Sequence, residues 1–235
     1  KPIFNMIEAP ICAGSPTVGS EKAYIALKEN GISKAFDGKL KFTDYGTMPT
    51  DTPDRFDNMK HLGVVREVSE RIYATVKQAA LRGEIPLVVG GDHSVAMGTI
   101  AGISAVYGAE NIAIVYIDGH TDINTEISSA SGYIHGMPLA ASLGLCCDEL
   151  VIGESKVKLF GKNIHIVGAR SIDDGEYPII EANSVDLMTA DECKNAGADA
   201  VVDSVVSKLG DKKVLISFDV DCMDQTEFSS TGYLM

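Results

Sequence analysis

The sequence is poor in features that would mark a disulfide-stapled, membrane-spanning or nucleic-acid-binding protein. Its cysteines number five, an odd count with no C-x-x-C spacing, which disfavours a disulfide framework or structural zinc site and favours a reducing, cytoplasmic compartment. No apolar run approaches the length of a membrane span. Lysine and arginine total 20 against 33 aspartates and glutamates, giving a formal net charge of −13. Such a surface repels nucleic acid and anionic membranes, but it is compatible with a small cationic substrate.

What the chain has instead is an alternation of short apolar runs and helical patterns. The runs are rich in valine and isoleucine and mostly lack polar alternation, which predicts buried parallel strands covered on both faces. The predicted strands are residues 3–10, 40–45, 86–89, 112–117, 164–167 and 214–218. The predicted helices are residues 22–29, 57–82, 96–106, 138–143, 175–183 and 198–209. The alternation favours an α/β fold, a single domain over residues 1–235 with three αβα layers and a mostly parallel sheet.

Three segments rich in aspartate and histidine occur where predicted strands end. GGDHS begins at Gly90, DGHTD begins at Asp118, and SFDVD begins at Ser217. Open parallel sheets bind their ligands beyond the carboxyl ends of the strands. The side chains of the three segments are therefore expected to converge on one point.

The residue types in these segments suit metal ions. Side chains at i, i+2 and i+4 of an extended segment share one face, as Asp118, His120 and Asp122 do, and Asp219 and Asp221 have the same spacing. Carboxylates packed together repel one another unless cations neutralise them. Six ligands favour a pair of ions, and a carboxylate-rich set with imidazoles suits two Mn²⁺, with Co²⁺, Fe²⁺ or Zn²⁺ as alternatives. The candidate metal ligands are His93, Asp118, His120, Asp122, Asp219 and Asp221.

Each segment taken alone also has a structural interpretation. GGDHS is compatible with a tight turn that opens a helix, with Asp92 or Ser94 as the N-cap. An isolated D-x-H is compatible with a turn, and Asp219 and Asp221 are compatible with a solvated loop. Their joint occurrence at three strand ends favours the metal site.

In combination, the segments resemble the arginase–agmatinase (ureohydrolase) family along nearly the whole chain. Two flanking stretches resemble arginases rather than agmatinases. One is DINT at 122–125, continuing to SGYIHGMP at 131–138, and the other is VGARSIDDGE at 167–176. The resemblance implies hydrolysis of a guanidinium group, and for the arginase branch the conversion of L-arginine and water to L-ornithine and urea. It also implies a homo-oligomer, a trimer or hexamer.

The resemblance assigns roles to individual positions. One manganese would be held by His93, Asp118, Asp122 and Asp219. The other would be held by His120, Asp118, Asp219 and Asp221, so that Asp118 and Asp219 bridge the pair.

Catalytic and substrate-binding roles follow from the same resemblance. Asp122 would orient the attacking hydroxide and pass on its proton, and His135 would shuttle protons near the mouth of the cleft. The residues matching the contacts to the amino-acid end of the substrate are Asn124, Ser131, Asp173 and Glu176. His135 is also compatible with a surface or capping histidine. Asp173 and Glu176 are equally compatible with the acidic first turn of a helix.

The sequence departs from the family pattern at several positions. Gly119 replaces a usual alanine, Tyr133 replaces an asparagine, Gln225 replaces a proline, and Tyr233 replaces a threonine. The family's late glutamate has no counterpart, and we expect the domain to lack its C-terminal part. The two tyrosines keep alternative substrates open, as in an agmatinase, guanidinobutyrase or formimidoylglutamase. A non-catalytic homologue is a further alternative, against which the complete ligand set argues.

Overall fold

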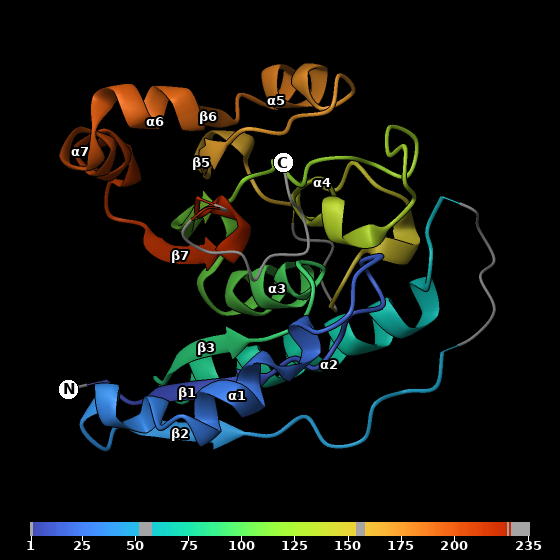
Figure 1. Cartoon of the computed structure of the whole chain (residues 1–235), viewed down its shortest axis with the longest axis vertical. Helices are drawn as coiled ribbons and strands as arrows, with labels where there is room; N and C mark the ends of the chain where they lie inside the picture. The colour runs from blue at the N-terminus through green and yellow to red at the C-terminus, as the bar shows by residue number, and fades with distance from the viewer. Residues whose placement is uncertain (1, 52–57, 154–157, 225, 227–235) are drawn as a thin grey trace.

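The computed structural model describes residues 2–51, 58–153, 158–224 and 226. Strands alternate with helices along the chain (Figure 1). The strands are β1 (Phe4–Glu8), β2 (Leu40–Thr43), β3 (Ile85–Val89), β4 (Ile112–Ile117), β5 (Ile164–Ala169), β6 (Asp186–Thr189) and β7 (Lys213–Phe218). The α-helices are α1 (Ala23–Glu29), α2 (Leu62–Leu81), α3 (Val95–Tyr107), α4 (Pro138–Leu143), α5 (Tyr177–Asn183), α6 (Ala190–Ala196) and α7 (Ala198–Leu209). The short 3-10 helices are η1 (Ser20–Lys22), η2 (Ile32–Phe36), η3 (Ala109–Asn111), η4 (Ile134–Gly136), η5 (Asp148–Leu150), η6 (Gly161–Asn163) and η7 (Val220–Cys222).

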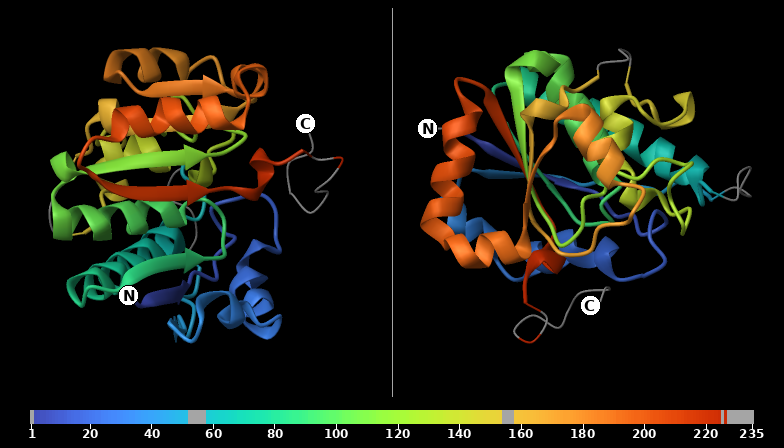
Figure 2. Two further views of the ribbon diagram at one scale, coloured as in Figure 1. Left: turned by 90° about the vertical axis from the view of Figure 1, so that its left-hand side faces the viewer. Right: turned by 90° about the horizontal axis from the view of Figure 1, so that it is seen from above.

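Every strand pairing in the described part of the chain is parallel. The hydrogen bonds form two groups, with the strand orders β2-β1-β3 and β6-β5-β4-β7. The strands of both groups point the same way, so their carboxyl ends lie at one edge of the molecule (Figure 2, left). Helices lie on both sides of the strands, with α7 on one side and α2 on the other (Figure 2, right). The predicted parallel three-layer α/β fold is confirmed.

The buried core explains why the helices cover the strands. Helix α2 turns one apolar stripe inward, and Val65, Ile72 and Val76 are at most 1% exposed. Helix α3 packs closely against it because Gly102 has no side chain. A Cβ at that position would lie 2.8 Å from Val76 and 2.9 Å from the carbonyl oxygen of Tyr73. This close approach holds α3, and with it the segment before α3, in a fixed place.

The structure corrects several predicted boundaries. Helix α2 begins at Leu62 rather than near residue 57, because His61 has a left-handed φ of 55° that a helix does not accommodate. Strand β6 and helix α6 were not predicted. Helix α6 carried a sequence signal, however, since Thr189 and Glu192 form a capping box at its start.

Strand β7 differs from the predicted strand covered on both faces. It lies at the edge of its group, and Val214, Ile216 and Phe218 are 44%, 66% and 56% exposed.

No helix in the described part of the chain is long and apolar enough to cross a membrane.

A buried carboxylate ties the first strand group together at the end opposite the carboxyl ends of the strands. Glu84, just before β3, accepts hydrogen bonds from Asn5, Lys41 and Arg82 at 3.0, 2.7 and 2.8 Å. The hydrogen bond from Arg82 and then that from Lys41 outweigh burial and lower the pKa of Glu84 to about 2. Glu84 therefore anchors β1, β2 and the turn before β3.

We predict that Glu84→Gln destabilises the fold in a pH-dependent way. Because the pKa of Glu84 is lowered on folding, its contribution is complete above the unfolded-state pKa and is lost as the pH falls towards about 2. The loss at pH 7 should be on the order of 1–2 kcal/mol, since Lys41 and Arg82 are half exposed. Chemical unfolding of both proteins from pH 7 to pH 2.5 measures it. A difference in stability that stays constant across this range would contradict the prediction.

Candidate metal centre

The first histidine of the site is placed by the turn that leaves β3. Gly90 and Gly91 have φ values of 99° and 80°, a region that favours glycine. A Cβ on Gly91 would lie 2.6 Å from the carbonyl oxygen of Ala9 and 2.9 Å from that of Ile11. Asp92 then turns away from the strand ends and accepts a hydrogen bond from the Gly14 amide at 2.8 Å. His93 is left facing the ends of β4 and β7.

The aspartates come from the two neighbouring strand ends. After β4, the amide of His120 donates to Asp118 at 2.7 Å, and Asp122 adopts a left-handed φ of 48°. After β7, the amide of Asp221 donates to Asp219 at 3.0 Å. The Gly119 amide also donates to Asp221 at 3.0 Å, which joins the two strand ends directly. Strands β4 and β7 are paired in the sheet, so their ends arrive side by side.

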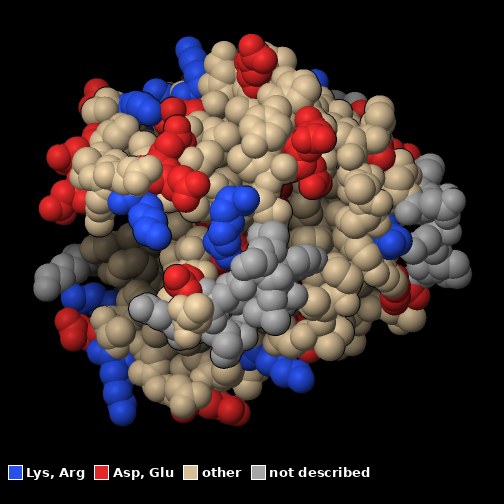
Figure 3. All heavy atoms as spheres, turned by 45° about the horizontal axis from the view of Figure 1, so that its top comes forward, with Lys and Arg blue, Asp and Glu red and all other residues tan. Residues whose placement is uncertain are grey.

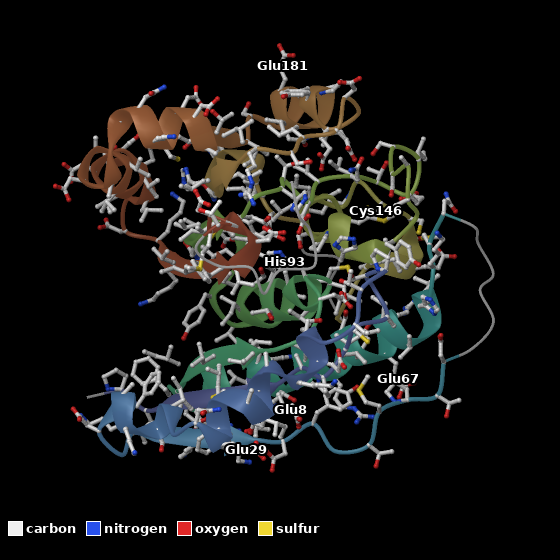
Figure 4. The ribbon with its side chains drawn as sticks, in the orientation of Figure 1. Glu8, Glu29, Glu67, His93, Cys146 and Glu181 are labelled. Atoms are coloured by element: carbon white, nitrogen blue, oxygen red, sulfur yellow. The ribbon has the colours of Figure 1, made fainter. Side chains whose placement is uncertain are left out.

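One group of ligand atoms surrounds the ring of His93. Its Nδ1 lies 2.9 Å from Asp118, 3.0 Å from Asp122 and 3.3 Å from Asp219. Ions bound at about 2.1 Å place neighbouring ligand atoms about 3 Å apart, so this spacing fits a shared cation. Figure 4 shows His93 in the interior, between α3 and β7.

A second group surrounds His120 and shares one carboxylate with the first. The His120 Nδ1 lies 3.0 Å from Asp221 and 3.5 Å from Asp118. Asp118 faces His93 with Oδ2 and His120 with Oδ1, the arrangement of a bridging ligand. Within the described residues, His93, Asp118 and Asp122 form one set that could hold an ion, and Asp118, His120 and Asp221 form another. Asp219 is in neither set and reaches the cluster through His93.

The buried atoms of this cluster match the needs of metal ions. His93 Nδ1 and Asp118 Oδ2 are buried and have no hydrogen-bond partner, although they face each other. Burial lowers the pKa of His93, but the three surrounding carboxylates outweigh it and raise the pKa well above its usual range. Likewise, burial lowers the pKa of His120, and Asp118 and Asp221 raise it to about 10. The cluster thus draws positive charge, which divalent cations would supply by displacing the protons.

Two further side chains orient the ligands and were not predicted. Ser217 Oγ lies 2.7 Å from His93 Nε2, so it fixes the ring from the side opposite the ligand atom. The Tyr116 hydroxyl donates to Asp122 at 2.8 Å, and its ring stacks on His93 with the centroids 4.5 Å apart. Both residues lie two positions before a predicted ligand, Asp219 or Asp118. The period of two in a strand was the signal that could have identified them.

Comparisons with known proteins agree with this arrangement. The profile of the arginase family matches residues 7–234. The chain belongs to the arginase family. It is therefore a hydrolase of the arginase type, a class that acts on amidines. An arginase from Bacillus caldovelox is 33% identical over 99% of this chain and 80% of that protein. Human arginase-1 is 32% identical over 97% of this chain and 74% of that protein.

Solved structures show the same fold. The native arginase structure from Bacillus caldovelox superposes with a TM-score of 0.89 at 30% identity, covering 96% of this chain and 78% of that one. The Bacillus cereus arginase also gives 0.89 at 30% identity, covering 100% and 80%. A formiminoglutamase from Trypanosoma cruzi gives 0.73 at 18% identity, covering 97% and 73%, a likeness of fold alone.

Of the four positions that the family pattern assigns to substrate contacts, Asn124, Asp173 and Glu176 lie in the segment after Asp122 or are hydrogen-bonded to it. Asn124 is buried and donates to Asp173 at 2.9 Å, while Ser131 is exposed. Glu176 is 3% exposed, and its two oxygens accept the amides of Ile123 and Asp173 at 3.0 and 2.8 Å. Glu176 therefore holds the segment that follows Asp122, a positioning role that the sequence did not indicate.

The departures from the family pattern have different structural settings. Gly119 leaves room for Arg170, because a Cβ there would lie 2.8 Å from the guanidinium and 2.9 Å from Asp221. Arg170 uses that space to donate to the carbonyl oxygen of Asp221. Gln225 and Tyr233 lie outside the described residues.

His135 lies in the half-buried helix η4, and its amide donates to the carbonyl oxygen of Gly14 at 3.0 Å.

The face drawn in Figure 3 carries acidic and basic side chains interspersed.

We predict that Ser217→Ala weakens metal binding without unfolding the protein. Without Ser217 Oγ, His93 Nε2 loses the partner that fixes the ring. The affinity for Mn²⁺ should fall about 10- to 100-fold, the usual effect of losing a hydrogen-bond partner of a ligating histidine. Calorimetric titration of metal-free protein measures this change. Ser207→Ala on α7, an exposed serine that within the described residues bonds to its own helix at Ser204, is the matched control. Equal affinities for the two variants would show that the Ser217 contact is unimportant.

We also predict that Asp118→Asn and Asp221→Asn differ in stoichiometry. Asp118 faces both histidines, so its loss should weaken both sites, whereas Asp221 faces one of the two, His120. The parent should bind two Mn²⁺ per chain, Asp221→Asn one, and Asp118→Asn neither at the same free concentration. Metal analysis after equilibrium dialysis gives these numbers. One retained ion in both variants would contradict a bridging Asp118.

Proposed function

We propose that this protein hydrolyses L-arginine to L-ornithine and urea and depends on two Mn²⁺ ions. The observation that carries the proposal is the convergence of His93, His120 and four aspartates, with Asp118 between the two histidines. When bound, the ion pair supplies Lewis acidity that lowers the pKa of a water molecule, so that a nucleophile exists near neutral pH. Co²⁺, Fe²⁺ or Zn²⁺ would fit the same mixture of carboxylates and imidazoles less well.

The residues of the chain divide the remaining tasks. His93, Asp118, Asp122 and Asp219 would hold one ion, and His120, Asp118, Asp219 and Asp221 would hold the other. Asp122 is 6% exposed, and the Tyr116 hydroxyl holds one of its oxygens at 2.8 Å. It would accept the proton of the attacking water and pass it to the leaving amine.

The outer residues would handle the substrate and the proton. His135 is half-buried one turn before α4, and it would exchange protons with solvent, a task that an imidazole side chain can perform. Asn124 and Ser131 would contact the tail of the substrate. The exposed carboxylate of Asp173 would contact its ammonium group, with Glu176 holding the backbone amide of Asp173 in place.

Tyr133 favours a second candidate function. It is half-buried beside His135, with the ring centroids 6.5 Å apart, at a position where arginases commonly have asparagine. A ring at this place would alter the room for the substrate tail. The second candidate is therefore a related ureohydrolase acting on agmatine, guanidinobutyrate or formiminoglutamate. Measuring the turnover of these compounds beside arginine distinguishes the two candidates.

We further propose that residues 1–235 belong to one catalytic domain, that the protein works in the cytoplasm, and that it forms a trimer or hexamer. Mass measurement in solution tests the assembly.

We predict urea release from L-arginine by the Mn²⁺-loaded protein and its loss in two variants. Asp122→Asn removes a ligand and the proton acceptor, so kcat should fall by more than about 100-fold together with metal content. His135→Asn removes only the proton shuttle, so kcat should fall about 100-fold while both ions stay bound.

Colorimetric urea assays beside metal analysis provide both measurements. Asp174→Asn, an exposed carboxylate next to Asp173, is the control and should keep parental activity. Hydrolysis of another guanidino compound without any urea from arginine would replace the main proposal by the second candidate.

A further inference from the structure

A lysine from a distant part of the chain is fixed beside the loop that runs from the metal ligands to His135. Lys60 Nζ lies 4.3 Å from the centroid of the Tyr133 ring. The two residues also form a parallel bridge, and the Lys60 amide donates to the carbonyl oxygen of Gly132 at 2.9 Å. Backbone and side chain therefore hold Lys60 at this place together.

Neighbouring contacts fasten the same segment to the loop. The Asn58 side chain donates to the carbonyl oxygen of Glu126 at 2.5 Å, and the Cys147 thiol lies 3.3 Å from the Met59 sulfur. Met59 is 3% exposed and belongs to the core cluster that includes α2. Lys60 thus extends from a segment anchored in the core, so its ammonium occupies a defined position.

A short chain of contacts connects this ammonium with the metal centre. Tyr133 is 6.5 Å from His135, ring to ring, and the His135 amide donates to Gly14. Gly14 in turn donates to Asp92, the residue before the metal ligand His93. On the other side of Tyr133, its amide donates to the hydroxyl of Ser131 at 3.3 Å. The cation therefore lies beside the loop that carries Ser131, Tyr133 and His135, which we call the rim.

In the part of the chain that the structure describes, the contacts of Lys60 leave its positive charge unpaired with an anion. Within the described residues Lys60 forms no salt bridge, and a cation–π contact with a half-buried ring contributes only about 0.5–1 kcal/mol. A lysine ammonium has three donors, and a ring face does not use them as hydrogen bonds. The rim also lies next to an exposed carboxylate, since the Asn124 amide donates to the carbonyl oxygen of Gly136 and the Asn124 side chain donates to Asp173. The rim is therefore flanked by a cation at Lys60 and an anion at Asp173.

We propose that Lys60, oriented by Tyr133, binds an anionic group of the substrate and makes the site select guanidino compounds that carry a carboxylate at the far end. The inference rests on the proposed hydrolysis of a guanidinium group. A zwitterionic tail matches the rim, with its carboxylate at Lys60 and its ammonium at Asp173. Tyr133 would then act indirectly. Its ring holds the Lys60 ammonium in position and does not itself contact the substrate.

The test compares pairs of ligands that differ only in the carboxylate. L-Arginine and agmatine form the substrate pair, and L-ornithine and 1,4-diaminobutane form the pair that is not hydrolysed. In Lys60→Met, kcat/KM for arginine should fall about tenfold or more, mainly through KM, because a charged contact is lost. The value for agmatine should stay within about twofold. The calorimetric Kd for L-ornithine should rise by the same factor, while the Kd for 1,4-diaminobutane stays unchanged.

Matched variants separate this role from a structural one. Lys60→Arg and Tyr133→Phe keep the cation or the ring, and should retain most of the preference for the carboxylate. Tyr133→Leu releases the Lys60 ammonium from the ring and should lose part of the preference for the carboxylate. Lys77→Met on α2 removes a lysine that lies 5.3 Å from the Tyr73 ring, away from the strand ends, and should change nothing.

The outcomes distinguish this inference from the proposed function. Equal losses for arginine and agmatine in Lys60→Met, or no loss, would overturn the inference while leaving hydrolysis intact. If the parent hydrolyses neither compound, the proposed function fails, and the ornithine measurements still decide the role of Lys60. A parent that binds L-ornithine no better than 1,4-diaminobutane would also overturn the inference.

Discussion

The mutual repulsion of buried carboxylates is the constraint on which the site depends. Asp118, Asp122 and Asp221 are each at most 6% exposed, and Asp219 lies beside them. Bringing such groups together costs several kcal/mol unless cations lie between them. In the metal-free cluster, two histidines can take up that role by binding protons, as the raised pKa values of His93 and His120 show. Protons and metal ions therefore compete for the same atoms.

The fold offsets this repulsion with contacts made outside the cluster. Ser217, Tyr116 and the amide of Gly119 each hold one ligand from behind, so the ligand atoms stay aimed at a common point. These partners come from β4, the turn that follows it, and β7, and the two strands are paired along their length. The rigidity of the sheet is thus transmitted to the site through hydrogen bonds rather than through the loops alone. Such preorganisation is what a site for paired cations requires.

The sequence allowed prediction of what depends on local spacing. The period of two in extended chain identified Asp118, His120 and Asp122, and the carboxyl-end rule predicted that they would meet Asp221 and His93. The same rules extend to Tyr116 and Ser217, although neither was singled out. The parallel α/β class followed from apolar runs that alternate with helical patterns. Helix α6 was missed because its seven residues bury no side chain and show no apolar stripe, and only its capping box marked it.

Other features depend on contacts between distant residues, and the sequence could not indicate them. Lys60 and Tyr133 are brought together by the docking of a loop on the core, and nothing in the spacing of either residue signals the other. Glu176 accepts hydrogen bonds from the backbone amides of Ile123 and Asp173, and this role depends on the fold of its loop. The sequence instead suggested a substrate contact or the start of a helix. The exposure of β7 depends on its place at the edge of its group, which no composition rule determines.

The charge arrangement explains how one small site could distinguish the two ends of a substrate. The centre concentrates negative charge and therefore favours the cationic end, but this attraction alone would admit any guanidino compound. Selection requires an interaction that only the correct tail can make, together with a cost for tails that leave a group unpaired. A single lysine on the rim provides both. Its ammonium would pair with a carboxylate on the substrate tail. When the tail has no carboxylate, the ammonium would instead lie unpaired beside a positively charged substrate. The acidic centre and the lysine beside it thus have separate tasks, binding the reacting group and choosing the molecule that carries it.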